Sequence, residues 1–114
     1  MDEERWPTEW LRGVLELCVL AVVAEGETYG YAVIASLREA GLGTVKGGTL
    51  YPVLARLEVE GLLASSWRDG DSGPGRKYYA ATHLGRQALQ DRTDSWRTFT
   101  SRAGGLLEPR TADA

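Results

Sequence analysis

The chain has 114 residues, the usual size of a single domain built around one core. Hydrophobic residues make up 43% of it, which is enough for a packed interior and excludes a chain that is disordered throughout. The net charge of -3 excludes an overall basic character, so the charge sum alone indicates no nucleic-acid partner.

An N-terminal arm is expected over residues 1–8, followed by a first helix from Glu9 to about Ala24. Thr8 can cap this helix. The helix is apolar on most sides, which is typical of a helix that is buried on more than one face. In so small a domain, we expect one face in the core and another against a second copy of the chain. An exposed Trp6 in the arm would also be covered by the partner subunit.

Little in the sequence indicates a membrane, a metal or an enzyme. The apolar run Leu17–Ala24 is too short to cross a bilayer, and no charged segment with a small-residue cleavage site precedes it. Cys18 inside this run is typical of a buried thiol from a reducing compartment, so we expect a cytoplasmic protein. One cysteine and one histidine, His83, cannot complete a tetrahedral metal site, and no nucleophile–base spacing accompanies His83. We therefore expect no cofactor and no catalytic activity.

A second helix is predicted from Thr28, as its N-cap, to about Ala40, with Gly41–Gly43 ending it. Its narrow apolar stripe favours contact with one core. Tyr29 and Tyr31 at its start can fill the core. Alternatively, they can point their hydroxyls at DNA phosphates, because helix N-termini attract anions.

A third helix is predicted from Gly47 to the residue before Gly61, which has the position of a left-handed C-cap. Four leucine and valine residues recur along it with the spacing of one buried stripe: Leu50, Val53, Leu54 and Leu57. Its opposite face carries a hydroxyl, a phenol and cations, which a helix that reads a DNA groove needs. Arg56 can instead pair with Glu60 at i+4. The DNA-contacting residues predicted here are Lys46, Gly47, Thr49, Tyr51, Pro52 and Arg56.

Two β-like runs follow, over residues 62–68 and 77–82, and the connection between them is rich in turn formers. Three helices followed by a hairpin are typical of a winged helix-turn-helix. The hairpin, or wing, of such a fold touches the DNA backbone or minor groove beside the major-groove helix. Arg68, Arg76 and Lys77 on its two arms are therefore predicted to contact DNA.

Thr82 can cap a last helix from His83 to about Ala103, which Gly104 and Gly105 should end before a flexible tail over residues 106–114. A long helix beside a small domain has little core to pack on, so pairing with a second subunit would bury its aromatic residues. The predicted dimer interface contains Trp6, Trp10, Leu11, Leu89, Trp96 and Phe99. An apolar effector cavity between the subunits is predicted to be lined by Trp10, Leu15, Val19, Trp96 and Phe99, unless these residues only fill the interface.

Several of these segments together resemble the PadR family of bacterial transcriptional regulators over about residues 9–103. The segments that carry the resemblance are Leu11–Leu17, Tyr29-Gly30-Tyr31, Gly48–Glu58, Gly75–Tyr79 and Thr82–Gly85. The resemblance implies a homodimeric repressor that dimerises through its first and last helices. It also implies release from DNA by a small, aromatic or planar effector. The single C-terminal helix is similar to the short subfamily.

The expected fold class is mainly α with a small β-hairpin (α+β). It consists of a winged helix-turn-helix DNA-binding domain over residues 9–82 and a dimerisation helix over residues 83–105. The expected partners are double-stranded DNA with a pseudo-palindromic operator, a second copy of the chain and a small-molecule effector. The acidic net charge leaves an alternative open, a winged-helix protein–protein interaction module without DNA binding.

Overall fold

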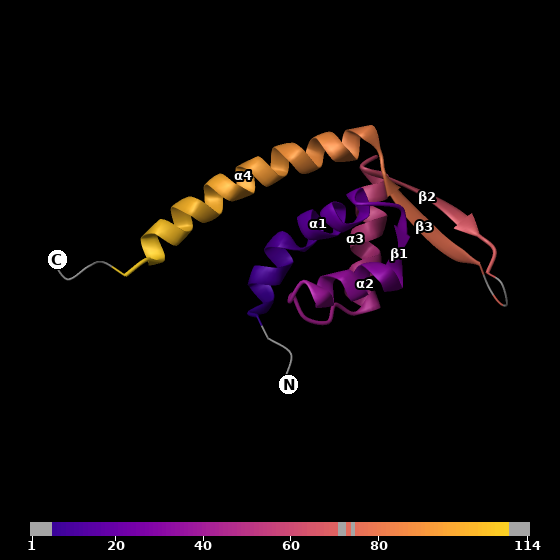
Figure 1. Ribbon diagram of the computed structural model, residues 1–114, viewed down its shortest axis with the longest axis horizontal. Helices are drawn as coiled ribbons and strands as arrows, with labels where there is room; N and C mark the ends of the chain where they lie inside the picture. The colour runs from indigo at the N-terminus through magenta and orange to yellow at the C-terminus, as the bar shows by residue number, and fades with distance from the viewer. Residues whose placement is uncertain (1–5, 71–72, 74, 110–114) are drawn as a thin grey trace.

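A computed structural model of the protein describes residues 6–70, 73 and 75–109. In chain order its elements are α1 (Thr8–Ala24), β1 (Thr28–Tyr29), α2 (Gly30–Glu39), α3 (Gly47–Val59), β2 (Leu63–Arg68), β3 (Arg76–Ala81) and α4 (His83–Leu107). The three shorter helices form a compact body, from which the wing (β2 and β3) and α4 extend in different directions (Figure 1). This mainly helical architecture with a small antiparallel sheet confirms the expected fold class.

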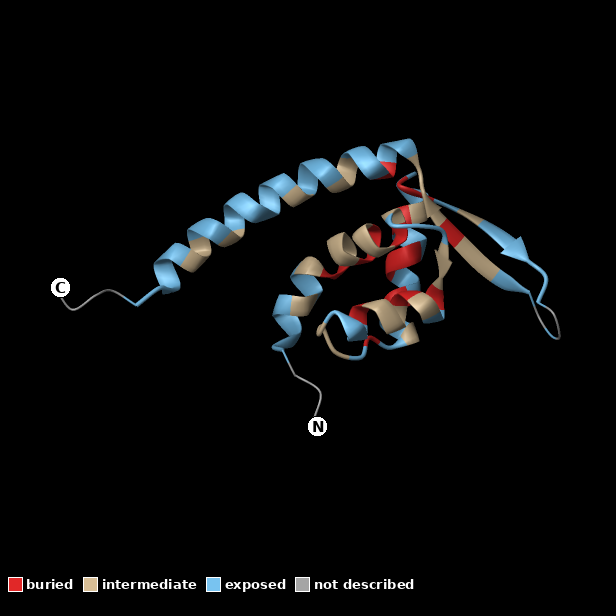
Figure 2. Ribbon diagram, in the orientation of Figure 1, coloured by how far each residue is buried: buried red, intermediate tan, exposed pale blue. Residues whose placement is uncertain are grey.

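The core lies between α1, α2 and α3, where the buried segments gather (Figure 2). The stripe predicted for α3 is confirmed, since Leu50, Val53, Leu54 and Leu57 are all buried. Gly61 follows the helix with a φ of 80°, and the N–H of Leu62 bonds to the carbonyl of Leu57 at 2.9 Å. This is the left-handed C-cap expected at that position.

Two residues predicted to line an effector cavity between subunits belong instead to this core. Val19 is 0% exposed and Leu15 is 4% exposed within one protomer. A helix that is apolar on most sides does not reveal which face its own domain covers. In the structure, the face of α1 that carries Leu15 and Val19 is covered by the protomer's own core. Val19 in particular is therefore inaccessible to a second subunit.

The sheet has the order β1-β3-β2, with β3 in the centre and both pairings antiparallel. The prediction that Thr28 caps the second helix is wrong, because Thr28 and Tyr29 pair with Tyr79 and Tyr78 of β3. A two-residue strand is too short to show any hydrophobic alternation, so the sequence pattern did not reveal it. The prediction for Thr8 is also wrong, since Thr8 is the first residue of α1 and Pro7 occupies the cap position.

At the start of α4, the cap predicted for Thr82 is confirmed. Its side-chain oxygen accepts a hydrogen bond from the Gly85 N–H at 3.0 Å and donates to the Gly61 carbonyl at 2.7 Å. The predicted end of the helix is wrong, because α4 continues through Gly104 and Gly105 to Leu107. Glycine inside a helix costs only about 1 kcal/mol relative to alanine, so two glycines do not by themselves end a helix. Residues 110–114 of the predicted tail lie outside the described residues.

Gly85→Ala is expected to lower the free energy of unfolding by about 1–3 kcal/mol, the usual cost of overpacking. A Cβ at position 85 would collide with the carbonyl oxygen of Leu62, which is backbone and already accepts a hydrogen bond from the Thr82 N–H. Gly104→Ala on the same helix is the matched control. No described atom lies within 4 Å of its added Cβ, so a gain of up to about 1 kcal/mol is expected. Equal stabilities of the two variants in urea unfolding would contradict this account.

Candidate nucleic-acid interface

The exposed face of α3 forms a narrow ridge between two grooves. At about 100° per residue, Gly48, Pro52, Ala55 and Val59 lie along its centre, opposite the buried stripe, and all four are exposed. These side chains are small or apolar, so the helix backbone can approach another surface closely. Pro52 has no N–H and leaves the Gly48 carbonyl without its helical partner. The ridge therefore offers mainly apolar contacts.

The first groove lies between the start of α2, the ridge and the wing, and has a volume of about 1060 Å³. Tyr51 occupies its junction, with the phenol ring so close to Gly30 that a Cβ there would overlap it. Burial raises the pKa of Tyr51, and the neighbouring hydroxyls of Tyr31 and Tyr79 raise it further. The Tyr51 hydroxyl therefore stays protonated near neutral pH and can donate a hydrogen bond. Tyr31, which is 71% exposed, borders the same groove.

The wing presents different side chains on its two faces. Trp67 is paired with Lys77, and Tyr79 is paired with Ser65, so these four share the face that covers the core and continues toward α3. Trp67 is 70% exposed on this face and lines the first groove. We did not predict this residue as a contact, because its face depends on the strand register.

Two of the predicted wing cations lie on the opposite face of the hairpin. The Arg68 guanidinium pairs with Glu27 and stacks over Tyr78, with 4.3 Å to the ring centroid. The Arg76 guanidinium lies 4.2 Å from the centroid of Tyr29. Tyr29 itself stands edge-on to Tyr78, at 5.4 Å between centroids. These groups form one aromatic–cation cluster, and its four members also line the first groove, in which Tyr31 and Tyr51 meet.

Lys77, the third predicted wing cation, ties the wing to α3. Its ammonium nitrogen lies 3.4 Å from a carboxylate oxygen of Glu58, and the other oxygen accepts a 2.5 Å hydrogen bond from the Ser65 hydroxyl. The hydroxyl of Ser65 and the charge of Lys77 hold the pKa of Glu58 below its ordinary value. The two contacts fix the distance between the wing and the ridge.

A carboxylate whose pKa is lowered by folding stabilises the protein above its unfolded-state pKa, and this stabilisation is lost as the pH falls through the folded-state value. Glu58→Gln is therefore expected to reduce stability at pH 7, with a difference from wild type that shrinks toward about pH 3. Glu60→Gln is the matched control. The Glu60 carboxylate lies 3.9 Å from its guanidinium partner, Arg92, which is a longer contact than either of those that Glu58 makes. Urea unfolding at both pH values measures the difference. If Glu58→Gln lost the same stability at both pH values, the loss would not come from the contacts of the ionised Glu58 carboxylate.

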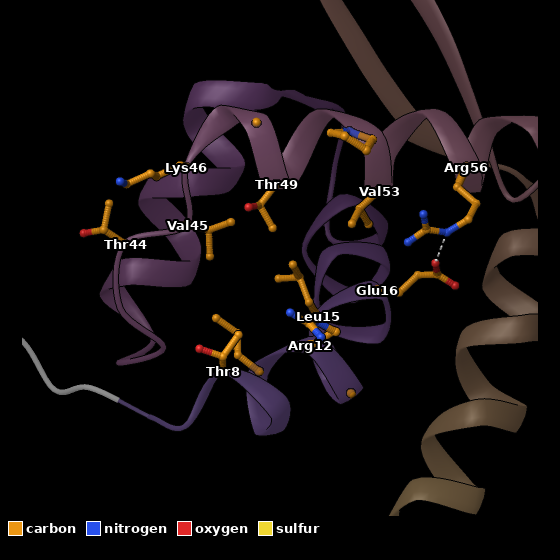
Figure 3. Close-up of a pocket in the computed structure, with 14 residues that line it drawn as sticks. Thr8, Arg12, Leu15, Glu16, Thr44, Val45, Lys46, Thr49, Val53 and Arg56 are labelled. Carbon is orange, nitrogen blue, oxygen red and sulfur yellow. Dashed lines mark hydrogen bonds and ion pairs between the residues drawn. The ribbon is translucent and has the colours of Figure 1, made fainter.

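The second groove lies between α1 and α3 on the other side of the ridge, with a volume of about 660 Å³ (Figure 3). The predicted contacts Lys46, Thr49, Pro52 and Arg56 all line it. The alternative prediction that Arg56 pairs with Glu60 is wrong. The Arg56 Nε–H donates to a carboxylate oxygen of Glu16 at 2.7 Å, across 40 residues of sequence.

Outside the grooves, apolar side chains remain exposed on α1 and α4. Trp10 is 64% exposed, Trp96 42% and Phe99 67%. Leu11 and Leu89, also predicted for the dimer interface, pack partly against the protomer's own core. Trp6 does not need a partner to order its side chain, since its indole N–H donates to the Gly41 carbonyl of the same chain at 3.1 Å.

Two other kinds of feature are absent from the described part of the chain. No cluster of three or more histidine, cysteine, aspartate or glutamate side chains could hold a metal ion there. None of the helices in that part combines the length and apolar character that a membrane span requires.

Comparisons with known proteins agree on one family. The sequence profile described as the transcriptional regulator PadR-like family matches residues 19–91. A transcriptional regulator of Mycobacterium tuberculosis is 41% identical over 83 residues, which are 73% of this chain and 76% of that protein. Among solved structures, a PadR family regulator from Eggerthella lenta has 40% identity and a TM-score of 0.80, covering 90% of this chain and 88% of its own.

A PadR-like regulator from Bacillus cereus is also similar, with 33% identity and a TM-score of 0.79 over 90% of this chain and all of its own. These relatives share the winged helix-turn-helix with a long C-terminal helix, the architecture in Figure 1. The family consists of regulators and not of enzymes. The chain belongs to the PadR-like family of transcriptional regulators.

Proposed function

We propose that this protein is a cytoplasmic, homodimeric repressor that reads an operator with α3 in the major groove. The observation that carries the proposal is the ridge of Gly48, Pro52 and Ala55, which stands exposed between two grooves lined with hydroxyls and cations. A ridge of small side chains fits a major groove about 12 Å wide, and apolar groups can contact thymine methyls. Tyr51 and Thr49 on its flanks supply donors for phosphates or base edges.

A second copy of the chain is proposed to complete the binding unit. α4 has 25 residues and is about 37 Å long, yet Gly85 is its only buried residue among those described. Trp96 and Phe99 stand exposed on its far half, and Trp10 is exposed on α1. Burying these aromatic surfaces against the partner's α1 and α4 would place two reading helices about one DNA turn, roughly 34 Å, apart. A pseudo-palindromic operator follows from that symmetry.

The proposed effector site lies at this interface, lined by Trp10, Trp96 and Phe99 from both subunits. Aromatic surfaces at a subunit interface favour a flat or cationic small molecule. Such a ligand would release DNA only if it binds one separation of the reading helices more tightly than the other. Leu15 and Val19 are not part of this proposal, because both are buried in the protomer core.

Binding to DNA from the region upstream of the protein's own gene tests the proposal. A mobility shift in about 50 mM and 200 mM salt is expected to show tight binding that weakens by orders of magnitude at the higher salt. The protein's cations displace counterions from the DNA phosphates, and the release of counterions becomes less favourable as the salt concentration rises. If the protein is folded and dimeric in solution but does not shift the DNA at low salt, the proposal is overturned. That result would favour the interaction module, with the exposed aromatic residues as its functional surface.

A further inference from the structure

We propose that the groove between α1 and α3 holds the DNA backbone on the side of α3 away from the wing, with Arg12 of α1 as a phosphate contact. The proposal rests on the proposed function, since it assumes that α3 enters the major groove. A helix in that groove has a sugar–phosphate backbone on each side. The wing and Tyr51 border one flank of the ridge, and the groove of Arg12 borders the other.

The charge of this groove suits an anionic chain. It is lined by three cations, Arg12, Lys46 and Arg56, and by one carboxylate, Glu16. Arg56 is already paired with Glu16, whereas Arg12 and Lys46 form no ion pair with any described residue. Two cations are therefore left to neutralise phosphates.

The arrangement of the cations favours a backbone over a single small anion. Figure 3 shows Lys46 and Arg56 at opposite ends of the groove, with Arg12 across from them on α1 and Thr49 directed between. Charges that converge on one point would select one compact ligand. Charges that are spread along a groove match successive phosphates of one strand, each of which takes one cation.

The floor of the groove is packed by the protein itself. Val45 is 3% exposed, Leu15 4% and Val53 6%, so these side chains are already covered. Thr8 and Arg12 on the rim are both exposed. The rim of the groove therefore offers a hydroxyl and a guanidinium to a bound phosphate.

The proposed dimer interface leaves Arg12 free. Arg12 lies two positions after Trp10, which places their side chains about 200° apart around α1. Val14 and Leu17 lie on the Trp10 side, half-buried and outside the core cluster. A partner subunit that covers Trp10 therefore covers the side of α1 opposite Arg12.

The test compares Arg12→Gln, Arg12→Lys and wild type by fluorescence anisotropy over a series of salt concentrations. Each protein is titrated with labelled operator DNA and with an unrelated duplex. Arg12→Gln is expected to weaken binding to both duplexes by roughly a hundredfold, because each subunit loses a hydrogen bond to a charged group that is worth about tenfold in affinity. It should also reduce the slope of log affinity against log salt by about 1 per lost phosphate contact in each subunit. Arg12→Lys should keep the wild-type slope, because it keeps the charge.

Arg38→Gln is the matched control, since Arg38 is an exposed arginine that lines neither groove, and it should bind as wild type does. A wild-type slope and affinity in folded Arg12→Gln would overturn this proposal and leave the proposed function standing. A loss for the operator alone would also overturn it, because a backbone contact does not depend on sequence. Wild type that binds neither duplex would overturn the proposed function and this proposal with it.

Discussion

Replacing Trp96 and Phe99 together with glutamate is expected to convert the proposed dimer to monomers and to weaken operator binding by roughly a hundred- to ten-thousandfold. Both side chains are exposed in the protomer, so the folded monomer loses little when they become charged. In the dimer, four unpaired carboxylates would be brought into an apolar interface, where burying a charge is very costly. The loss of affinity equals the avidity gained by joining two binding modules.

Light scattering coupled to size-exclusion chromatography measures the mass, and anisotropy measures the affinity for the operator. Thr98→Glu is the control, because position 98 lies about 200° from Trp96 around α4 and the substitution adds one negative charge to the other side of the helix. The control is expected to remain dimeric. A double variant that stays dimeric, or a monomer that binds the operator as tightly as wild type, would contradict the proposed assembly.

Tyr51→Ala is expected to cost about 2–6 kcal/mol of operator binding. One specific side-chain contact is worth about 1–3 kcal/mol, and a dimer loses it in both half-sites. The Tyr51 ring is fixed against Gly30 at the junction of α2, α3 and the wing, so its hydroxyl is held in place before DNA binds. Anisotropy with operator DNA measures the loss, and thermal unfolding verifies that the variant is folded.

Tyr51→Phe removes the hydroxyl and keeps the ring. It is expected to lose part of the operator affinity that Tyr51→Ala loses. Gly30→Ala should reproduce much of the Tyr51→Ala effect without removing the phenol, since the added methyl displaces the ring. Unchanged operator affinity in Tyr51→Ala would exclude Tyr51 from the interface.

Short sequence patterns predicted the structural features that depend on residues close together in the chain. The four-residue stripe of α3 faces the core, Gly61 adopts the left-handed conformation and Thr82 caps α4. Each of these features depends on residues within one or two turns of each other. The order of three helices and a hairpin then indicated the winged helix correctly.

Features that depend on distant residues were missed. Arg56 pairs with Glu16, 40 residues away, and not with Glu60 on its own helix. The face on which Trp67 lies is set by its pairing with Lys77. Helical periodicity carries no information about partners on other elements, so the composition of the two grooves follows only from the fold.

The α3 ridge and its two flanking grooves are proposed to contact DNA. Backbone amide chemical shifts of the labelled protein, recorded by NMR with and without one equivalent of operator duplex, test this contact most directly. The largest changes are expected over residues 46–56, with further changes at Arg12, Tyr31 and Trp67. Changes confined to α4 and the Trp10 side of α1, with residues 46–56 unaffected, would contradict it.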